Sequence, residues 1–320
     1  MPACLPRFKN AKSCFFILLL GLLSIILISG CGINEQEELH SKDEAEREFI
    51  RICKQEYNWD VNTESIGNTL WIYIPYLQDI FKLKANKFSQ VSKFSVTSLN
   101  GDFAKGTFYF EYQIAPLLKP EENKGYTYGL TDPVSQDFQN VLNAIFRVYF
   151  NAEQQPEFYV VVMADIANGV EVIYTIYGLD LKKIYSNAIA SEEYYKRILQ
   201  DIRGSLAIIR DKQGKHLIYQ EINLAQFLAK QITQRIRIKF MGSDFELQTT
   251  TEEEILGIVS YCLQTYEFEE FLAVVLRNLS TGTETIKSLS ALSAYNEPPA
   301  KPAPPADTPG DTTFPGDGSL

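Results

Sequence analysis

Apolar residues recur with helical spacing in five stretches of the chain between residues 41 and 268. In these stretches they lie three and four positions apart, which places them on one face of a helix. The first stretch opens with Ser41 and Glu44, a pair that forms a capping box at a helix N-terminus. The sequence therefore predicts helices over 41–59, 132–146, 191–202, 223–234 and 250–268.

Other stretches alternate apolar and polar residues or are rich in β-branched and aromatic residues, which predicts strands. The clearest is 157–178, where two such runs flank Asn168-Gly169, a dipeptide that favours a tight hairpin turn. A second hairpin is expected over 206–222, with its turn near Gln213-Gly214. Further strands are expected over 69–75, 94–115 and 235–240, and 271–279 fits a strand or a helix.

Antiparallel hairpins interleaved with amphipathic helices indicate an α+β fold rather than a doubly wound sheet. Helix followed by hairpin recurs irregularly, which suggests αββ units without a true sequence repeat. Residues 116–133 interrupt the pattern with three prolines and two glycines. They are interpreted as a subdomain boundary or a surface loop.

The first 30 residues combine a basic start with a short apolar run. Three basic residues precede the run from Cys14 to Ile28, which is shorter than the roughly 20 residues of a membrane-spanning helix. A basic start, a short apolar run and small residues at its end describe a secretory signal peptide. An uncleaved membrane helix is the alternative, because the stretch from Ser13 to Asn34 carries no charge.

The end of the apolar run, Ile28-Ser29-Gly30-Cys31, resembles the lipobox of bacterial lipoproteins. The resemblance implies cleavage between Gly30 and Cys31 and a diacylglyceride on the Cys31 thiol. It implies a lipid-anchored protein of the bacterial cell envelope that faces the periplasm or the exterior. Gly32 favours the outer membrane in a cell that has one, because an Asp at that position in such lipoproteins favours the inner membrane.

Composition divides the remainder of the chain into three parts. Residues 31–42 form a polar tether, and 43–296 form the α+β body. Residues 297–320 hold seven of the 14 prolines, with Phe314 as the single large apolar residue before the last position. A segment of this kind buries too little apolar surface to become ordered, so 297–320 is predicted to be a disordered tail.

The charge balance excludes one class of partner. The signal peptide holds three of the 30 basic residues and none of the 40 acidic ones, so the mature chain has a net charge of −13. An acidic protein repels the phosphates of nucleic acids. The partners expected are the membrane, through the lipid anchor, and an envelope protein or cell-wall polymer.

Cys53 and Cys262 are the cysteines left after Cys4 and Cys14 are removed and Cys31 is acylated. An exported protein meets an oxidising environment, so these two could form one disulfide. Two unrelated buried thiols are the alternative, because both cysteines lie on apolar faces of expected helices.

Motifs of metal, nucleotide or nucleophilic catalysis are absent from the sequence, so no catalytic residue, cofactor or metal is predicted. His216 is the single histidine of the body beyond the tether, and it is expected to be structural or solvated rather than catalytic. Arg235, Arg237 and Lys239 alternate with apolar residues, which gives the expected strand a basic face. This face could hold an anionic polymer or lipid phosphate, or it could protect a sheet edge from pairing.

Three functions agree with these observations. A non-catalytic lipid-anchored protein with a binding or assembly role is preferred, because of the anchor and the missing motifs. The alternatives are a carboxylate-dependent periplasmic hydrolase and a lipoprotein that binds a small ligand in a cleft. Paired acids in a pocket would favour the hydrolase, and a deep apolar cleft between subdomains would favour ligand capture. A convex body with neither feature would leave the binding or assembly role.

Overall fold

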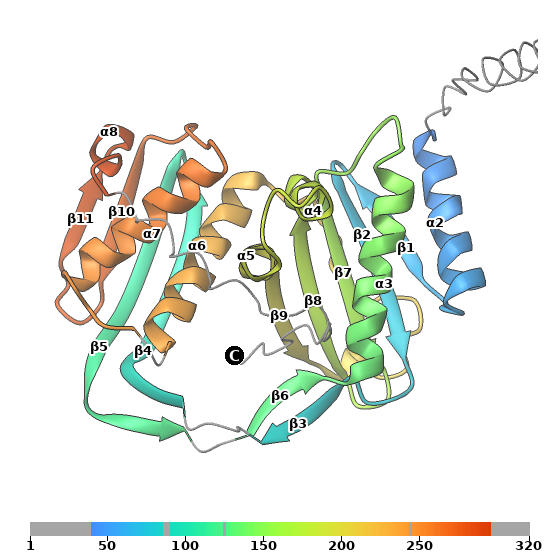
Figure 1. The fold of residues 1–320 in the computed structure, drawn as a ribbon, viewed down its shortest axis with the longest axis horizontal. Helices are drawn as coiled ribbons and strands as arrows, with labels where there is room; N and C mark the ends of the chain where they lie inside the picture. The colour runs from blue at the N-terminus through green and yellow to red at the C-terminus, as the bar shows by residue number, and fades with distance from the viewer. Residues whose placement is uncertain (1–39, 86–89, 124–125, 243–244, 296–320) are drawn as a thin grey trace, which may run out of the picture.

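The computed structural model describes residues 40–85, 90–123, 126–242 and 245–295. Within these residues helices combine with mixed β-sheets, which confirms the predicted α+β class. The chain forms two lobes that lie side by side, each with its own sheet and helices (Figure 1). Among the residues described, no helix is long and apolar enough to cross a membrane.

The first lobe is built on a five-stranded sheet with strand order β1-β2-β7-β8-β9. β2 and β7 are parallel, and the other neighbours are antiparallel. Every residue of the central strand β7 is buried, and its hairpin with β8 turns at Gly169, which has a φ of +73°. The strands are β1 (Asn62–Ile66), β2 (Thr69–Tyr76), β7 (Phe158–Asp165), β8 (Val170–Tyr177) and β9 (Leu199–Gly204).

Helices cover one face of this sheet and form the larger core of the lobe. α2 begins with the predicted capping box, in which the backbone N–H of Ser41 donates to the Glu44 carboxylate at 2.9 Å. The opposite face carries a smaller core, which the segment 205–222 covers. The helices are α2 (Lys42–Glu56), α3 (Asp132–Tyr149), α4 (Gly178–Tyr185) and α5 (Ser191–Arg197).

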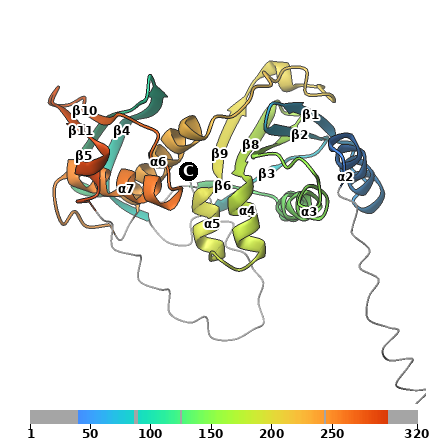
Figure 2. The same ribbon diagram turned by 90° about the horizontal axis from the view of Figure 1, so that it is seen from above.

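The second lobe has a four-stranded sheet with strand order β11-β10-β5-β4, and α6 and α7 lie beside it (Figure 2). β4 and β5 form a long antiparallel hairpin, and β10 adds parallel to β5. The strands are β4 (Gln90–Ala104), β5 (Thr107–Asn123), β10 (Ala273–Asn278) and β11 (Glu284–Lys287). The helices are α6 (Leu224–Met241), α7 (Thr251–Thr265) and α8 (Leu289–Leu292).

A short ribbon of β3 (Phe81–Ala85) and β6 (Tyr126–Leu130) lies between the two sheets (Figure 1). The surface-loop interpretation of residues 116–133 is therefore wrong, whereas the alternative of a subdomain boundary agrees with the structure, because the chain passes from the second sheet to α3 of the first lobe within this range. β5 continues through two of the prolines to Asn123, β6 follows, and α3 starts at Asp132. Proline is compatible with a strand at edges and irregular positions, where its missing N–H breaks no ladder bond.

Three further local predictions are corrected. The helix expected over 191–202 ends at Arg197, and the next residues form β9 against β8. Residues 206–222 do not form a hairpin: they contain a short 3₁₀ turn, η1 (Leu206–Ile208), and irregular chain. A turn does occur at Gly214, which has a φ of +70°, but its flanking residues form no strand ladder. Asp211 instead accepts from the backbone N–H groups of Gln213 and His216, and its carbonyl accepts from Tyr73 of the first sheet.

The expected strand 235–240 is the C-terminal part of helix α6. Ile236 and Phe240 are completely buried, whereas Ile238 between them is 44% exposed. A strand face would have buried all three, but helical spacing continues the buried row of Leu228 and Ile232 through Ile236 and Phe240. The alternation of basic and apolar residues over 235–240 therefore resembles a strand pattern but lies on a helix.

Candidate functional site

A groove with a volume of about 950 Å³ lies between the two lobes. Its lining residues come from β2, β7, β8 and β9 of the first lobe, from segment 205–222, and from β4 and α6 of the second lobe. In both views α6 lies between the second sheet and β9 (Figures 1 and 2). A concave site of this size between two lobes is typical of ligand-binding sites.

The floor of the groove belongs to the face of the first sheet opposite α2 and α3, which segment 205–222 partly covers. Trp71, Val160 and Ile173 from three neighbouring strands supply apolar surface there. Glu171 and Thr175 lie on the same face as Ile173, because side chains two positions apart in a strand point the same way. The floor therefore combines an apolar centre with polar groups toward its sides.

The segment 205–222 forms one wall, and side chains of β2 hold it in place. The Tyr73 hydroxyl donates to the carbonyl of Asp211 at 2.5 Å, and the Trp71 indole N–H donates to the carbonyl of Gln220 at 2.9 Å. These bonds satisfy polar atoms of two aromatic side chains that are otherwise buried. They give an irregular segment a defined position on the sheet.

His216 connects this wall to the floor. Its Nδ1 lies 2.6 Å from Oδ2 of Asp211, and its Nε2 lies 2.8 Å from Oε2 of Glu171. Burial lowers the pKa of His216, but the two carboxylates together outweigh burial and raise this pKa above its ordinary value of 6.5. For Asp211 the signs are reversed. Burial raises the pKa of this carboxyl, but the hydrogen bonds from His216 and Gln213 outweigh burial and lower the pKa below its ordinary value.

Each acidic side chain that lines the groove forms a hydrogen-bonded pair with a basic side chain. Glu171 and Asp201 are the acids among its lining residues; Glu171 bonds to His216, and Asp201 accepts from Nε of Arg203 at 2.7 Å. A general acid or base needs a carboxylate or imidazole with a position open to substrate. Both nitrogens of His216 are occupied by carboxylates, so this geometry favours a structural role for His216.

The second wall is a polar row on α6. Lys230, Thr233, Gln234 and Arg237 line the groove, at positions i, i+3, i+4 and i+7 of one helix face. Lys230 and Arg237 are exposed, and neither forms an ion pair with any residue that the structure describes. The wall thus presents two cations whose charges are available to a ligand.

Close approach of β4 to α6 sets the position of this wall. A Cβ atom on Gly101 of β4 would lie 2.3 Å from Oγ1 of Thr233 and 2.8 Å from the carbonyl oxygen of Ala229. Only a residue without a side chain fits at this contact.

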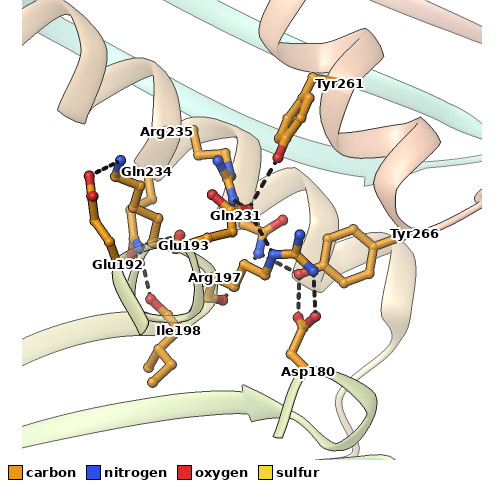
Figure 3. Close-up of polar contacts among 11 residues, drawn as sticks. Asp180, Glu192, Glu193, Arg197, Ile198, Gln231, Gln234, Arg235, Tyr261 and Tyr266 are labelled. Atoms are coloured by element: carbon orange, nitrogen blue, oxygen red, sulfur yellow. Dashed lines mark hydrogen bonds and ion pairs between the residues drawn. The ribbon is translucent and has the colours of Figure 1, made fainter. Parts of the chain in front are cut away.

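A buried polar network joins the lobes next to the groove (Figure 3). Arg197 at the end of α5 donates to Asp180 of α4 at 2.7 Å and to Glu193 at 2.8 Å. The Tyr266 hydroxyl, from the second lobe, donates to the other oxygen of Asp180 at 2.5 Å. Burial lowers the pKa of Arg197, but Glu193 and Asp180 outweigh it and raise this pKa, so the guanidinium stays charged.

The second lobe adds a further cation to this network. Arg235 of α6 donates to Glu193 at 2.6 Å, and its guanidinium lies 5.2 Å from the centre of the Tyr261 ring. Burial raises the pKa of Glu193, and Arg235 and Arg197 together outweigh it and lower this pKa. Gln231 donates to the backbone carbonyl of Arg197 at 3.1 Å. Charge-assisted bonds of this kind fix the orientation of the two lobes that form the groove.

The predicted basic stripe does not form one surface. On a helix, Arg235 and Lys239 fall on a different side from Arg237. Arg235 pairs with Glu193 and Lys239 pairs with Glu254, while Arg237 lines the groove.

The cysteine predictions resolve in favour of thiols. Cys53 is buried in the first lobe's core and Cys262 in the second lobe's core, and neither is in a disulfide. The disulfide prediction is therefore wrong, because apolar packing places the two residues in separate cores. Gly30 and Cys31 lie outside the described residues, as do the signal peptide, most of the tether and the tail. Across the described ranges no cluster of three or more metal-ligating side chains occurs.

Lys230, Thr233 and Gln234 were missed in the sequence as groove residues, whereas Arg237 was named as part of the expected basic stripe. One signal for the row on α6 was present. Lys230, Thr233, Gln234 and Arg237 form a polar row at helical spacing, which becomes visible once 224–241 is treated as one helix. The contacts of Glu171 with His216 have no such signal, because 45 residues separate them.

Comparison with known proteins gives no further guide to the site. No family model, curated protein or solved structure matches this chain.

Proposed function

We propose that this chain is a lipid-anchored protein of the bacterial cell envelope with a non-catalytic binding role. Its ligand, an envelope protein or cell-wall polymer, would bind in the groove between the lobes. The exposed polar wall of α6, with Lys230 and Arg237, fits such a chain better than the deep apolar cleft expected for a small-ligand lipoprotein. The anchor would be the acylated Cys31, and the tether would hold the body beside the membrane.

The observation that carries this proposal is the groove itself. It has a volume of about 950 Å³, an apolar floor and two cations, Lys230 and Arg237, that have no ionic partner among the described residues. Buried ion pairs hold the walls in place before a ligand arrives, which limits the entropy lost on binding. The lining acids are paired with His216 and Arg203, so carboxylate catalysis is not part of the proposal.

Site-specific photocrosslinking in intact cells tests the binding role. A photoreactive amino acid replaces Ile218, an 85% exposed residue that lines the groove. The matched control replaces Leu272, which is 75% exposed and outside the groove lining. We expect a specific adduct from position 218 and none from position 272. Equal adducts at both positions, or none at either, would contradict binding in the groove.

The anchor has its own test. Cys31→Ala should leave the precursor uncut and without lipid, whereas the wild-type chain should begin at Cys31 with a diacylglyceride on its thiol. Mass spectrometry of membrane-extracted protein distinguishes this from an intact Met1 terminus with an unmodified Cys31, which would indicate a transmembrane helix.

A further inference from the structure

We infer that the groove's ligand is an acidic peptide segment in extended conformation, which adds as a strand to the outer edge of β9. This inference rests on the proposed function, because it names the ligand class of the same groove. Three observations carry it: an open strand edge, a side chain that already imitates an added strand, and two available cations beside that edge.

β9 ends the five-stranded sheet and pairs with β8 alone. Residues 201–204 of β9 are exposed, and Leu199, Gln200, Asp201, Arg203 and Gly204 line the groove. An edge strand offers unpaired backbone groups to any chain that lies alongside it. Natural sheets commonly cover such an edge, but here the groove leaves the edge accessible.

The side chain of Gln234 shows which backbone groups of β9 point away from β8. Its Nε2 donates to the carbonyl of Ile198 at 2.8 Å, and its Oε1 accepts from the N–H of Gln200 at 3.3 Å. A residue of a neighbouring parallel strand bonds in the same way, to the carbonyl before and the N–H after the residue opposite it. The Gln234 amide therefore occupies the first position of an additional strand.

The next positions along this edge are open. Backbone groups alternate sides along a strand, so the N–H groups of Ile202 and Gly204 point to the same side as that of Gln200. Ser205, one residue further, donates back to the carbonyl of Gly169 at 2.9 Å, which agrees with this alternation. Within the described part of the chain, no hydrogen-bond partner takes up the outward N–H of Ile202 or Gly204.

The charges beside the edge select an acidic peptide. Lys230 and Arg237 are seven residues apart on α6, about 10 Å along the helix axis. Side chains on one face of an extended peptide are about 7 Å apart at two residues and about 13 Å apart at four. Long, flexible lysine and arginine side chains can reach carboxylates at either spacing.

A second copy of this chain fits the edge less well. Symmetric pairing through β9 would bring Lys230 and Arg237 of both copies toward one interface, where like charges repel. An acidic peptide instead neutralises these cations, and its backbone supplies the missing hydrogen bonds. Main-chain bonds then provide affinity and the carboxylates provide specificity.

The test is a selection of short random linear peptides, displayed on phage, against the full chain in detergent micelles. Enriched peptides should carry acidic residues two or four positions apart. Their affinity, measured by fluorescence anisotropy, should fall about tenfold for the double variant Lys230→Glu/Arg237→Glu, because attraction becomes repulsion. The matched control, Lys105→Glu/Lys212→Glu, changes two exposed lysines outside the groove lining and should retain full affinity.

Methylation of the peptide backbone separates strand addition from binding by charge alone. N-methyl groups at alternate residues remove the donors that face β9 and should weaken binding about tenfold, since two hydrogen bonds are lost. The same groups on the intervening residues should have little effect. Because the protein is unchanged, misfolding cannot explain the difference.

Four outcomes would overturn the inference. These are the absence of groove-dependent peptides, enrichment without acidic residues, equal effects of both methylation patterns, and a dimer that Ile202→Pro abolishes. Photocrosslinking from position 218 distinguishes failure of the acidic-peptide inference from failure of the proposed binding role. A protease-resistant adduct there would keep the groove as a binding site and exclude a peptide ligand, whereas no adduct would contradict the proposed function itself.

Discussion

Replacing Arg197 by methionine tests whether the buried network holds the lobes together. Arg197 and Asp180 have side-chain exposures of 7% and 3%. Methionine fills a similar space but leaves the Asp180 carboxylate without its cation and Glu193 with Arg235 alone. Loss of one partner from a buried ion pair costs about 3–5 kcal/mol, because the remaining charge is uncompensated. We expect Arg197→Met to lower the free energy of unfolding by about this amount.

The assay is urea unfolding followed by far-UV circular dichroism, with Arg51→Met as the matched control. Arg51 pairs with Glu48 at 2.5 Å, but their side chains are 47% and 32% exposed. Exposed pairs contribute about 0–1 kcal/mol, so this variant should stay close to the wild type. The measured difference between the two variants therefore reports the effect of burial.

A double-mutant cycle isolates the pair itself. Asp180→Asn/Arg197→Met removes both charges, so its loss of stability should be smaller than the sum of the two single losses. Additive losses would show that Arg197 acts through packing alone. A loss for Arg197→Met no larger than that for Arg51→Met would refute the role of the network.

Three further predictions concern the groove and the cores. His216→Gln should lower the melting temperature more near about pH 6 than near about pH 9. The raised pKa of His216 means that its charged form stabilises the fold below pH 6.5, and this contribution is lost as pH rises through the folded pKa. Equal losses at both pH values would contradict the contacts with Asp211 and Glu171. Gly101→Ala should cost about 1–3 kcal/mol by overpacking against Thr233, whereas Gly257→Ala in α7, where a Cβ meets nothing within 4 Å, should stabilise by up to about 1 kcal/mol; equal effects would disprove the close contact. Burial raises the pKa of Cys53 to about 12, so Cys53 should not react with thiol reagents in the folded mature chain with Cys31→Ser. In denaturant without reductant the same chain should show two titratable thiols. A titration that finds no thiol would restore the disulfide.

Local patterns predicted the elements that depend on neighbours in the chain. The capping box at Ser41, the apolar row of α3 and the Asn168-Gly169 hairpin were all correct. In each case the decisive interaction lies within a few residues, or the apolar period is long enough to identify one face. The α+β class followed from the same patterns.

Predictions failed where a long-range contact decided the structure. The apparent strand at 235–240 is helical because Ile236 and Phe240 continue a row that packs in the second core. The expected hairpin at 206–222 did not form, since its polar groups bond to β2 and β8 instead. Residues 199–202 of the expected helix became a strand because β8 offered an edge for pairing.

The sequence by itself determined the class of fold and its best-capped helices, and it carries the motif that predicts the lipid anchor. Only the tertiary structure placed Lys230 and Arg237 of α6 beside the open edge of β9, and only it showed Cys53 and Cys262 in different cores. The physical reason is the range of the interactions. Helix periodicity and capping act over three or four residues, whereas the groove depends on contacts such as Glu171 with His216 and Gln234 with Ile198, 45 and 36 residues apart.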